Sequence, residues 1–218
     1  MIKGVIFDLD GVLVSTDELH FKAWKMLAEE LGITNFTKDD NARQKGVSRM
    51  ASLEVVLEKA EDTYSYQEKL ELADRKNNYF IKLLENLTDR DVLPGVIETL
   101  SLLRKMGLRI GIGSASKNTP LILKETGLES YFDEVSCGLD ITRSKPDPEV
   151  FLIAAKKLEL SPKECLVVED SNAGVVAAKA ADMKTLGVGT EYKKLGTDYE
   201  ALTLQNEIDW SAIVCNAL

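Results

Sequence analysis

Short apolar runs separated by helical patterns constrain the fold more than any other feature of this chain. Four such runs lie at residues 5–7, 108–113, 165–168 and 184–188. Runs of this length suit strands that are buried on both faces. Apolar residues recur at helical spacing in the segments 96–106, 121–128, 150–158 and 175–181. Strands that alternate with helices predict an α/β fold, a Rossmann-like doubly wound parallel sheet with right-handed crossovers.

The segment 15–87 interrupts this alternation, because its pattern is helical throughout. Ser15 to Glu18 can cap a helix start, an apolar face that includes Trp24 follows, and Gly32 can end the helix. Further helical stretches lie around residues 50–60 and 66–87. We therefore expect an inserted all-helical cap domain at residues 15–87 and a core domain built from residues 1–14 and 88–218. The cap would sit over the carboxyl ends of the strands, where ligands bind in such sheets.

Composition and charge argue against several classes of function. The chain has 218 residues, of which 44% are apolar and 29% charged, as in a soluble globular protein. No apolar run approaches the roughly 20 residues that a bilayer requires, and no signal-peptide pattern precedes the first strand. We expect a cytoplasmic protein without a membrane partner. A formal net charge of −9 repels phosphate backbones, so nucleic acid is not an expected partner either.

Three cysteines, Cys137, Cys165 and Cys215, are far apart and include no CxxC pair. Free thiols in a reducing compartment are therefore expected in preference to disulfides or a zinc site.

Two carboxylates follow the first apolar run directly. Asp8 and Asp10 are two residues apart, so in an extended segment they face the same side while Leu9 points into the core. Carboxylates this close repel each other unless a cation intervenes, and a hard divalent cation such as Mg²⁺ prefers oxygen ligands. The alternative is a turn rich in aspartate, which is common after a strand.

Polar residues also follow later strands of the predicted sheet. Ser114 ends the run 108–113, and residues 116–119 with Pro120 can start a helix that offers free N–H groups to an anion. Two prolines flank Lys145 closely enough to aim its ammonium group, and Glu169 and Asp170 end another buried strand. Each feature has a simpler alternative, namely a helix cap for Ser114 and for the Glu–Asp pair and a surface turn for Lys145.

Taken together, Asp-x-Asp, Ser, Lys and Glu-Asp occur in this order at the carboxyl ends of one predicted sheet. The set resembles the haloacid dehalogenase (HAD) superfamily, whose members mostly transfer phosphoryl groups, and the resemblance spans the whole chain. It implies that Asp8 is the nucleophile that becomes an aspartyl phosphate and that Asp10 is the general acid and base. It also implies Mg²⁺ held by Asp8, Asp10 and Asp170 with support from Glu169, and phosphoryl oxygens neutralised by Ser114 and Lys145.

A second set of residues narrows the resemblance: in the expected cap, residues 45–49 with Ser52, His20 and residues 75–77, and in the expected core, residues 114–118. It is similar to the sugar-phosphate mutases of that superfamily, which are magnesium-dependent isomerases of carbohydrate metabolism. They interconvert β-glucose 1-phosphate and glucose 6-phosphate through β-glucose 1,6-bisphosphate, and are often monomers. The substrate-binding residues implied are Thr16, His20, Lys45, Gly46, Arg49, Ser52, Lys76, Ala115, Ser116, Lys117 and Asn118.

Arg49, with residues 116–118, would bind the phosphate at the far end of the sugar, while His20 and Lys76 would couple the cap to Asp10. Gln44 departs from this family, which usually has an apolar residue there, and Ser15 stands where an acidic residue is common.

Three alternative functions stay open, of which a partner-binding scaffold has the least support because no amphipathic face is left unassigned to a core. A sugar-phosphate phosphatase on the same scaffold would differ only in passing the phosphoryl group to water. A catalytically inactive sensor would bind sugar phosphate without turnover. The presence of both Asp8 and Asp10 argues against a sensor, because such a protein could lose either residue. Outside the resemblance, Arg49 could be a solvated helix charge and His20 a polar residue at a helix edge.

Overall fold

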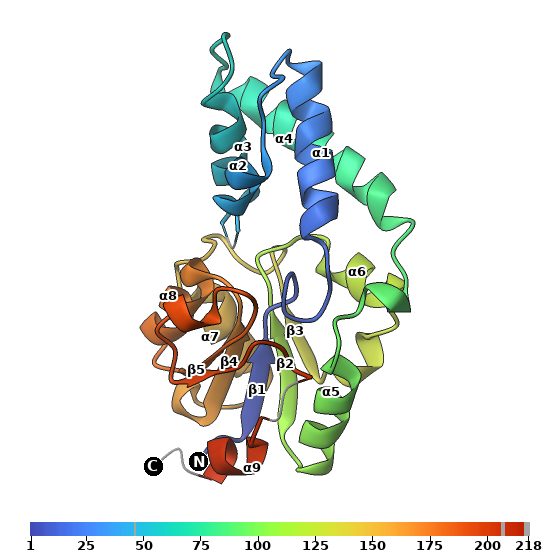
Figure 1. The fold of residues 1–218 in the computed structure, drawn as a ribbon. Coiled ribbons are helices and arrows are strands. Elements are labelled where there is room, and N and C mark those ends of the chain that lie inside the picture. The colour runs from blue at the N-terminus through green and yellow to red at the C-terminus, as the bar shows by residue number, and fades with distance from the viewer. Residues whose placement is uncertain (46, 206–207, 216–218) are drawn as a thin grey trace.

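A six-stranded parallel sheet forms the centre of the molecule (Figure 1). The computed structural model describes residues 1–45, 47–205 and 208–215. The strand order is β3-β2-β1-β4-β5-β6, which places the first strand in the middle, as a doubly wound sheet requires. The strands are β1 (Gly4–Phe7), β2 (Arg109–Gly113), β3 (Glu134–Ser136), β4 (Cys165–Glu169), β5 (Lys184–Gly187) and β6 (Tyr199–Glu200). The predicted α/β class is confirmed, while the short strands β3 and β6 were not predicted.

Helices cover both faces of the sheet. In Figure 1, α5 (Val96–Lys105) and α6 (Thr119–Glu125) lie on one side, and α7 (Glu149–Lys157) and α8 (Asn172–Ala180) lie on the other. The last helix, α9 (Trp210–Cys215), buries Trp210 in the same hydrophobic cluster as α5. The described residues also form four short 3₁₀ helices: η1 (Asp89–Asp91), η2 (Glu129–Tyr131), η3 (Pro162–Glu164) and η4 (Tyr192–Lys194). No helix in the described ranges is both long enough and apolar enough to cross a bilayer.

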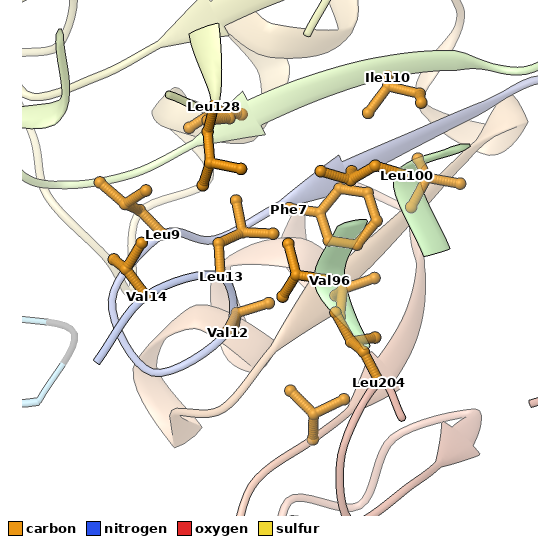
Figure 2. Close-up of a cluster of buried hydrophobic side chains, with 14 of the residues drawn as sticks. Phe7, Leu9, Val12, Leu13, Val14, Val96, Leu100, Ile110, Leu128 and Leu204 are labelled. Atoms are coloured by element: carbon orange, nitrogen blue, oxygen red, sulfur yellow. The ribbon is translucent and has the colours of Figure 1, made fainter. Parts of the chain in front are cut away.

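The central strand is apolar because both of its faces are covered. Val5 and Phe7 belong to the hydrophobic cluster beneath α5, whereas Ile6 belongs to the cluster beneath α7. This is the two-residue alternation of a strand. Figure 2 shows Phe7 among Val96, Leu100 and Ile110. Leu9 is fully buried in that cluster, so the chain after β1 is anchored where the two aspartates leave the strand.

Among the described residues, the first four α-helices after β1 rise beyond the strand ends and form the predicted all-helical cap (Figure 1). They are α1 (Asp17–Glu30), α2 (Lys38–Ala42), α3 (Arg49–Leu57) and α4 (Tyr66–Leu84). Trp24, Leu27, Leu53 and Leu72 pack into a hydrophobic cluster that belongs to the cap alone. Such a cluster stabilises the cap helices independently of the sheet. The five-residue helix α2 was not predicted, and the domain bounds at residues 14–15 and 87–88 stay predictions.

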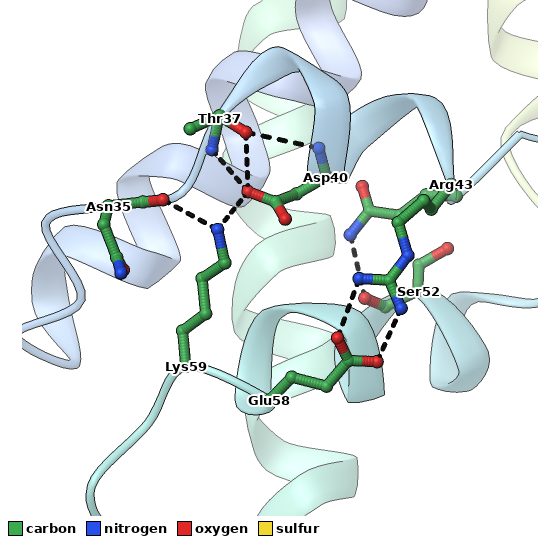
Figure 3. Close-up of polar contacts among 8 residues, drawn as sticks. Asn35, Thr37, Asp40, Arg43, Ser52, Glu58 and Lys59 are labelled. Carbon is green, nitrogen blue, oxygen red and sulfur yellow. Dashed lines mark hydrogen bonds and ion pairs between the residues drawn. The ribbon is translucent and has the colours of Figure 1, made fainter.

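Polar contacts tie α2 to the end of α3 (Figure 3). Lys59 bonds to Asp40 and, at 2.8 Å, to the backbone oxygen of Asn35. Arg43 binds both carboxylate oxygens of Glu58, each at 2.7 Å. These contacts join α2, and Arg43 directly after it, to the C-terminal end of α3.

The start of α1 differs from the expected helix cap. Thr16 occupies the capping position, but its side chain makes no capping hydrogen bond. Its hydroxyl instead donates to the Asp10 carboxylate. A hydroxyl at a helix start can bond either to the backbone or to another acceptor, and here the buried carboxylate is the stronger acceptor. Gly32 does end this helix, with a positive φ of 75°.

Candidate active site

The strand register brings the predicted core residues to one edge of the sheet. Phe7 lies opposite Ile112 of β2 and Val168 of β4. Asp8 therefore leaves the sheet beside the positions where Ser114 and Glu169 leave theirs, and its backbone N–H still donates to Val168 at 3.0 Å. Parallel strands end at a common edge, so residues distant in sequence converge there.

A buried lysine joins two of these carboxylates. Lys145 Nζ lies 2.7 Å from Asp8 Oδ1 and 2.6 Å from Glu169 Oε1. The ammonium group also stands 4.8 Å from the centre of the Phe151 ring. Burial lowers the pKa of Lys145, but the charges of Asp8 and Glu169 outweigh it and raise that pKa above its ordinary value. Lys145 is therefore a permanent positive charge beside Asp8, not a surface lysine in a turn.

Glu169 is held from both sides. While Oε1 accepts from Lys145, Oε2 accepts from the backbone N–H groups of Asp170 at 2.7 Å and Ser171 at 2.8 Å. The Ser171 hydroxyl donates to the same oxygen at 3.0 Å and accepts from the N–H of Gly174 at the start of α8. Glu169 thus fixes Lys145 on one side and the Asp170 backbone on the other.

The cluster has the oxygen donors of a divalent-cation site. Ligand atoms of Asp8, Glu169 and Asp170 lie within 4.8 Å of one another. Burial raises the pKa of Asp8 well above its usual value, and Lys145 offsets this only in part. Burial and the charge of Glu169 raise the pKa of Asp170 to about 7. The positive charges of the nearby lysines therefore do not fully balance the negative charge of these carboxylates. A hard cation such as Mg²⁺ would balance the remaining charge.

A β-carbon at position 11 would meet Asp170 Oδ2 at 2.3 Å, so only glycine lets the chain pass this carboxylate. Gly11 also adopts a positive φ of 82°. The chain at Gly11 and the side chain of Asp170 therefore pack directly against each other. The Asp10 side chain is not part of this group of three carboxylates.

Asp10 instead belongs to a polar chain that enters the cap. It accepts the Thr16 hydrogen bond, and its Oδ1 lies 4.0 Å from His20 Nε2. His20 Nδ1 lies 3.0 Å from Lys76 Nζ, and the imidazole stacks on Phe80 at 4.0 Å. Burial, Lys76 and Arg49 lower the pKa of His20 well below its usual value, so the ring is neutral. When Lys76 is an ammonium group it can only donate, so in that state Nδ1 of His20 accepts and Nε2 carries the proton that faces Asp10.

Arg49 meets the start of α6 through a residue of α4. Asn77 Oδ1 accepts from Arg49 at 2.9 Å and from the Asn118 amide, also at 2.9 Å. Arg49 lies 3.6 Å from Asp74 as well. On the core side, Ser116 Oγ accepts from the backbone N–H of Asn118 at 3.2 Å. Asn77 therefore links the cap arginine to the core loop 116–118.

Lys45 forms a second contact between cap and core. Its Nζ lies 2.7 Å from Asp17 Oδ2 and 3.3 Å from Asp170 Oδ2. The two carboxylates outweigh partial burial and raise the pKa of Lys45.

A single cavity of about 540 Å³ connects these groups. Most of the predicted site residues border it, namely Asp8, Asp10, His20, Lys45, Arg49, Ser52, Lys76, Ser114, Ala115, Ser116, Lys117, Asn118, Lys145 and Asp170. Thr16 and Glu169 are fully buried behind this lining. Gly46 lies outside the described residues. The cavity also adds residues that the sequence did not single out for binding: Asp17, Asn41, Gln44, Asp74, Asn77 and Gly138.

Comparison with known proteins defines the class. The sequence pattern of the haloacid dehalogenase-like hydrolases matches residues 5–188, and this chain belongs to that family. It is 43% identical to a β-phosphoglucomutase of Bacillus subtilis, covering 90% of this chain and 88% of that protein. It also resembles the crystal structure of a β-phosphoglucomutase from Clostridium difficile, with a TM-score of 0.89, 36% identity and coverage of 98% and 96% of the two chains. A phosphorylated carbohydrates phosphatase of Thermotoga maritima is 31% identical over 85% of this chain and 84% of its own length.

Proposed function

We propose that this protein is a β-phosphoglucomutase, a magnesium-dependent isomerase that interconverts β-D-glucose 1-phosphate and glucose 6-phosphate through β-glucose 1,6-bisphosphate. In this proposal, residues 1–14 and 88–218 form the core domain and residues 15–87 the cap domain. The protein would act as a cytoplasmic monomer on sugar phosphates. The similarity to two β-phosphoglucomutases supports the choice of substrate.

One observation carries the proposal. The same cavity is bordered by Asp8 and Lys145 and by the cap's Arg49 with Asn118. A mutase must hold a bisphosphate by both ends, whereas a phosphatase requires only the end that reacts. Arg49 presents a planar fork that suits the oxygens of a second phosphate.

The residues of the cavity divide the reaction between them. Asp8 attacks the phosphorus atom and becomes an aspartyl phosphate, while Lys145 and Ser114 offset charge on the phosphoryl oxygens. Asp10 takes a proton from the attacking sugar hydroxyl and returns it to the leaving oxygen. Burial raises the pKa of Asp10 despite the Thr16 hydrogen bond, which suits a group that must carry a proton. The contacts of Lys45 with Asp170 and of Asn77 with Asn118 join the cap to the core, and they would hold the cap over the aspartyl phosphate and exclude water.

Asp8, Asp170 and the Asp10 carbonyl would hold Mg²⁺, with Glu169 in support, and the ion would neutralise charge on the transferring phosphoryl group. A chelator should therefore remove turnover, and added Mg²⁺ should restore it.

A coupled assay tests the proposal directly. The protein is given Mg²⁺, a trace of β-glucose 1,6-bisphosphate and β-glucose 1-phosphate, and both glucose 6-phosphate and free phosphate are followed. We expect glucose 6-phosphate to rise with little free phosphate. Free phosphate that matches the loss of substrate would identify a phosphatase instead, and the assigned role of Arg49 would be withdrawn. Binding of sugar phosphate without either product would identify a sensor.

A further inference from the structure

Gln44 carries an unpaired buried oxygen at the cap side of the cavity. Its side chain is only 8% exposed and borders the cavity. The amide Nε2 donates to the backbone oxygen of Ser52 at 2.8 Å. Because that carbonyl can only accept, the contact identifies which arm of the amide is nitrogen. The other arm, Oε1, is buried and has no hydrogen-bond partner in the part of the chain that the structure describes.

The neighbouring donors are already engaged. Arg43 directs both terminal nitrogens of its guanidinium group to Glu58 at 2.7 Å, and Figure 3 shows this pair beside Ser52. Lys45, on the other side of Gln44, is bonded to Asp17 and Asp170. A buried carbonyl oxygen without a donor lowers the stability of the folded protein. A hydrogen bond from a ligand would offset that loss.

We infer that Gln44 is a specificity-determining residue: when the sugar binds, its amide turns towards the cavity, and Oε1 accepts a hydrogen bond from a hydroxyl of the sugar ring. The inference rests on the proposed function. If Asp8 and Lys145 serve one phosphate and Arg49 and Asn118 the other, the ring lies between them and its hydroxyls require acceptors. An apolar side chain at position 44 would tolerate a sugar that lacks the hydroxyl. An unpaired amide oxygen disfavours such a sugar, because the oxygen stays buried without a partner.

Deoxy sugars test this inference by measuring binding alone. The dissociation constants of glucose 6-phosphate and its 2-, 3- and 4-deoxy forms are measured by calorimetry on the wild type, Gln44→Leu and Gln44→Met. Gln67→Leu is the matched control, because Gln67 is an exposed glutamine of the cap outside the cavity lining. In the wild type and the control, one deoxy form should bind roughly five- to tenfold more weakly than the parent through the Gln44 contact. In both Gln44 variants that loss should disappear, while losses for the other deoxy forms persist.

Identical losses in the wild type and both Gln44 variants would overturn the inference, and they are the result expected if water alone satisfies Oε1. Gln44→Met guards against misfolding of Gln44→Leu, and melting temperatures identify a variant that fails to fold. The coupled assay separates this inference from the proposed function. If glucose 6-phosphate is produced normally but no deoxy form loses affinity through Gln44, only the inference is refuted. A Gln44-dependent loss without mutase turnover refutes only the proposed function, and no binding of glucose 6-phosphate by the wild type refutes both.

Discussion

The core and the cap hold their charged residues in different ways. In the core, Lys145 and Glu169 are almost fully buried and bond to each other, and Glu169 also accepts from two backbone N–H groups after β4. In the cap, Lys45 is 40% exposed and Arg49 is 25% exposed, and both bond to side chains of other elements. Backbone anchoring fixes a group's position, whereas contacts between side chains can be exchanged for a ligand. The core is therefore built for fixed chemistry, and the cap for recognition that accompanies closure.

Removal of the core nucleophile should have the largest effect and tests whether the core carries the chemistry. Asp8→Asn keeps the size of the side chain but cannot form the aspartyl phosphate, so turnover should fall on the order of 10⁴-fold or more. Mass spectrometry of the acid-quenched protein should find a phosphoryl adduct on the wild type and none on the variant. Circular dichroism should show a folded variant. Substantial residual turnover would refute the assignment of Asp8.

Removing the cap arginine tests the recognition side. Arg49→Ala should weaken use of β-glucose 1,6-bisphosphate by roughly 10- to 100-fold, because a charged hydrogen bond to the second phosphate is lost. Hydrolysis of a simple phosphate ester, which has no second phosphate, should change far less. Arg43→Ala is the control, since Arg43 is a cap arginine bound to Glu58 and outside the cavity lining. Equal losses for both substrates would show that Arg49 does not bind the distal phosphate.

The cap also holds a titratable lysine, Lys76, which contacts His20. Burial, followed by Arg49, lowers the pKa of Lys76 from 10.5 to about 7. Between these values the unfolded chain binds a proton that the folded protein does not, so Lys76 makes stability increase as the pH rises through this window. The free energy of unfolding of the wild type, relative to Lys76→Met, should therefore rise by up to about 1.4 kcal/mol per pH unit.

Urea unfolding of both proteins at several pH values between 7 and 10 measures this difference. Lys82→Met, which alters an exposed lysine of the same helix, controls for the loss of a positive charge. Parallel pH dependence of wild type and Lys76→Met would contradict a perturbed Lys76.

The sequence predicts the core far better than the cap, for a physical reason. Asp8, Ser114 and Glu169 each follow an apolar strand, and parallel strands must end at one edge, so their convergence follows from the fold class. Strands β3 and β6 have three and two residues and form by pairing with a neighbour, so local sequence did not predict them. Helix α2, with five residues, is likewise too short to show a helical period.

In the cap, periodicity predicts α1, α3 and α4 but not which of their polar residues meet. The contact between Arg49 of α3 and Asn77 of α4 depends on how the two helices pack, and that packing has no signature in local sequence. The segment Ser15 to Glu18 was expected to cap α1, but the hydroxyl of Thr16, which occupies the capping position, donates to the buried Asp10 carboxylate instead. Residue type alone also gave no reason to assign Asn77 to the site.

Asn77 offers the mildest test, because it contacts both Arg49 and Asn118 and carries no charge of its own. Asn77→Ala should raise the KM for the bisphosphate a few-fold with kcat nearly unchanged, since losing a side chain that only positions Arg49 and Asn118 should weaken binding by about 1 kcal/mol. Asn78→Ala is a matched control on the same helix, exposed and outside the cavity lining. A fall in kcat without a change in KM would mean that Asn77 acts on the chemistry of the core, and the division between a catalytic core and a recognising cap would then fail at this residue.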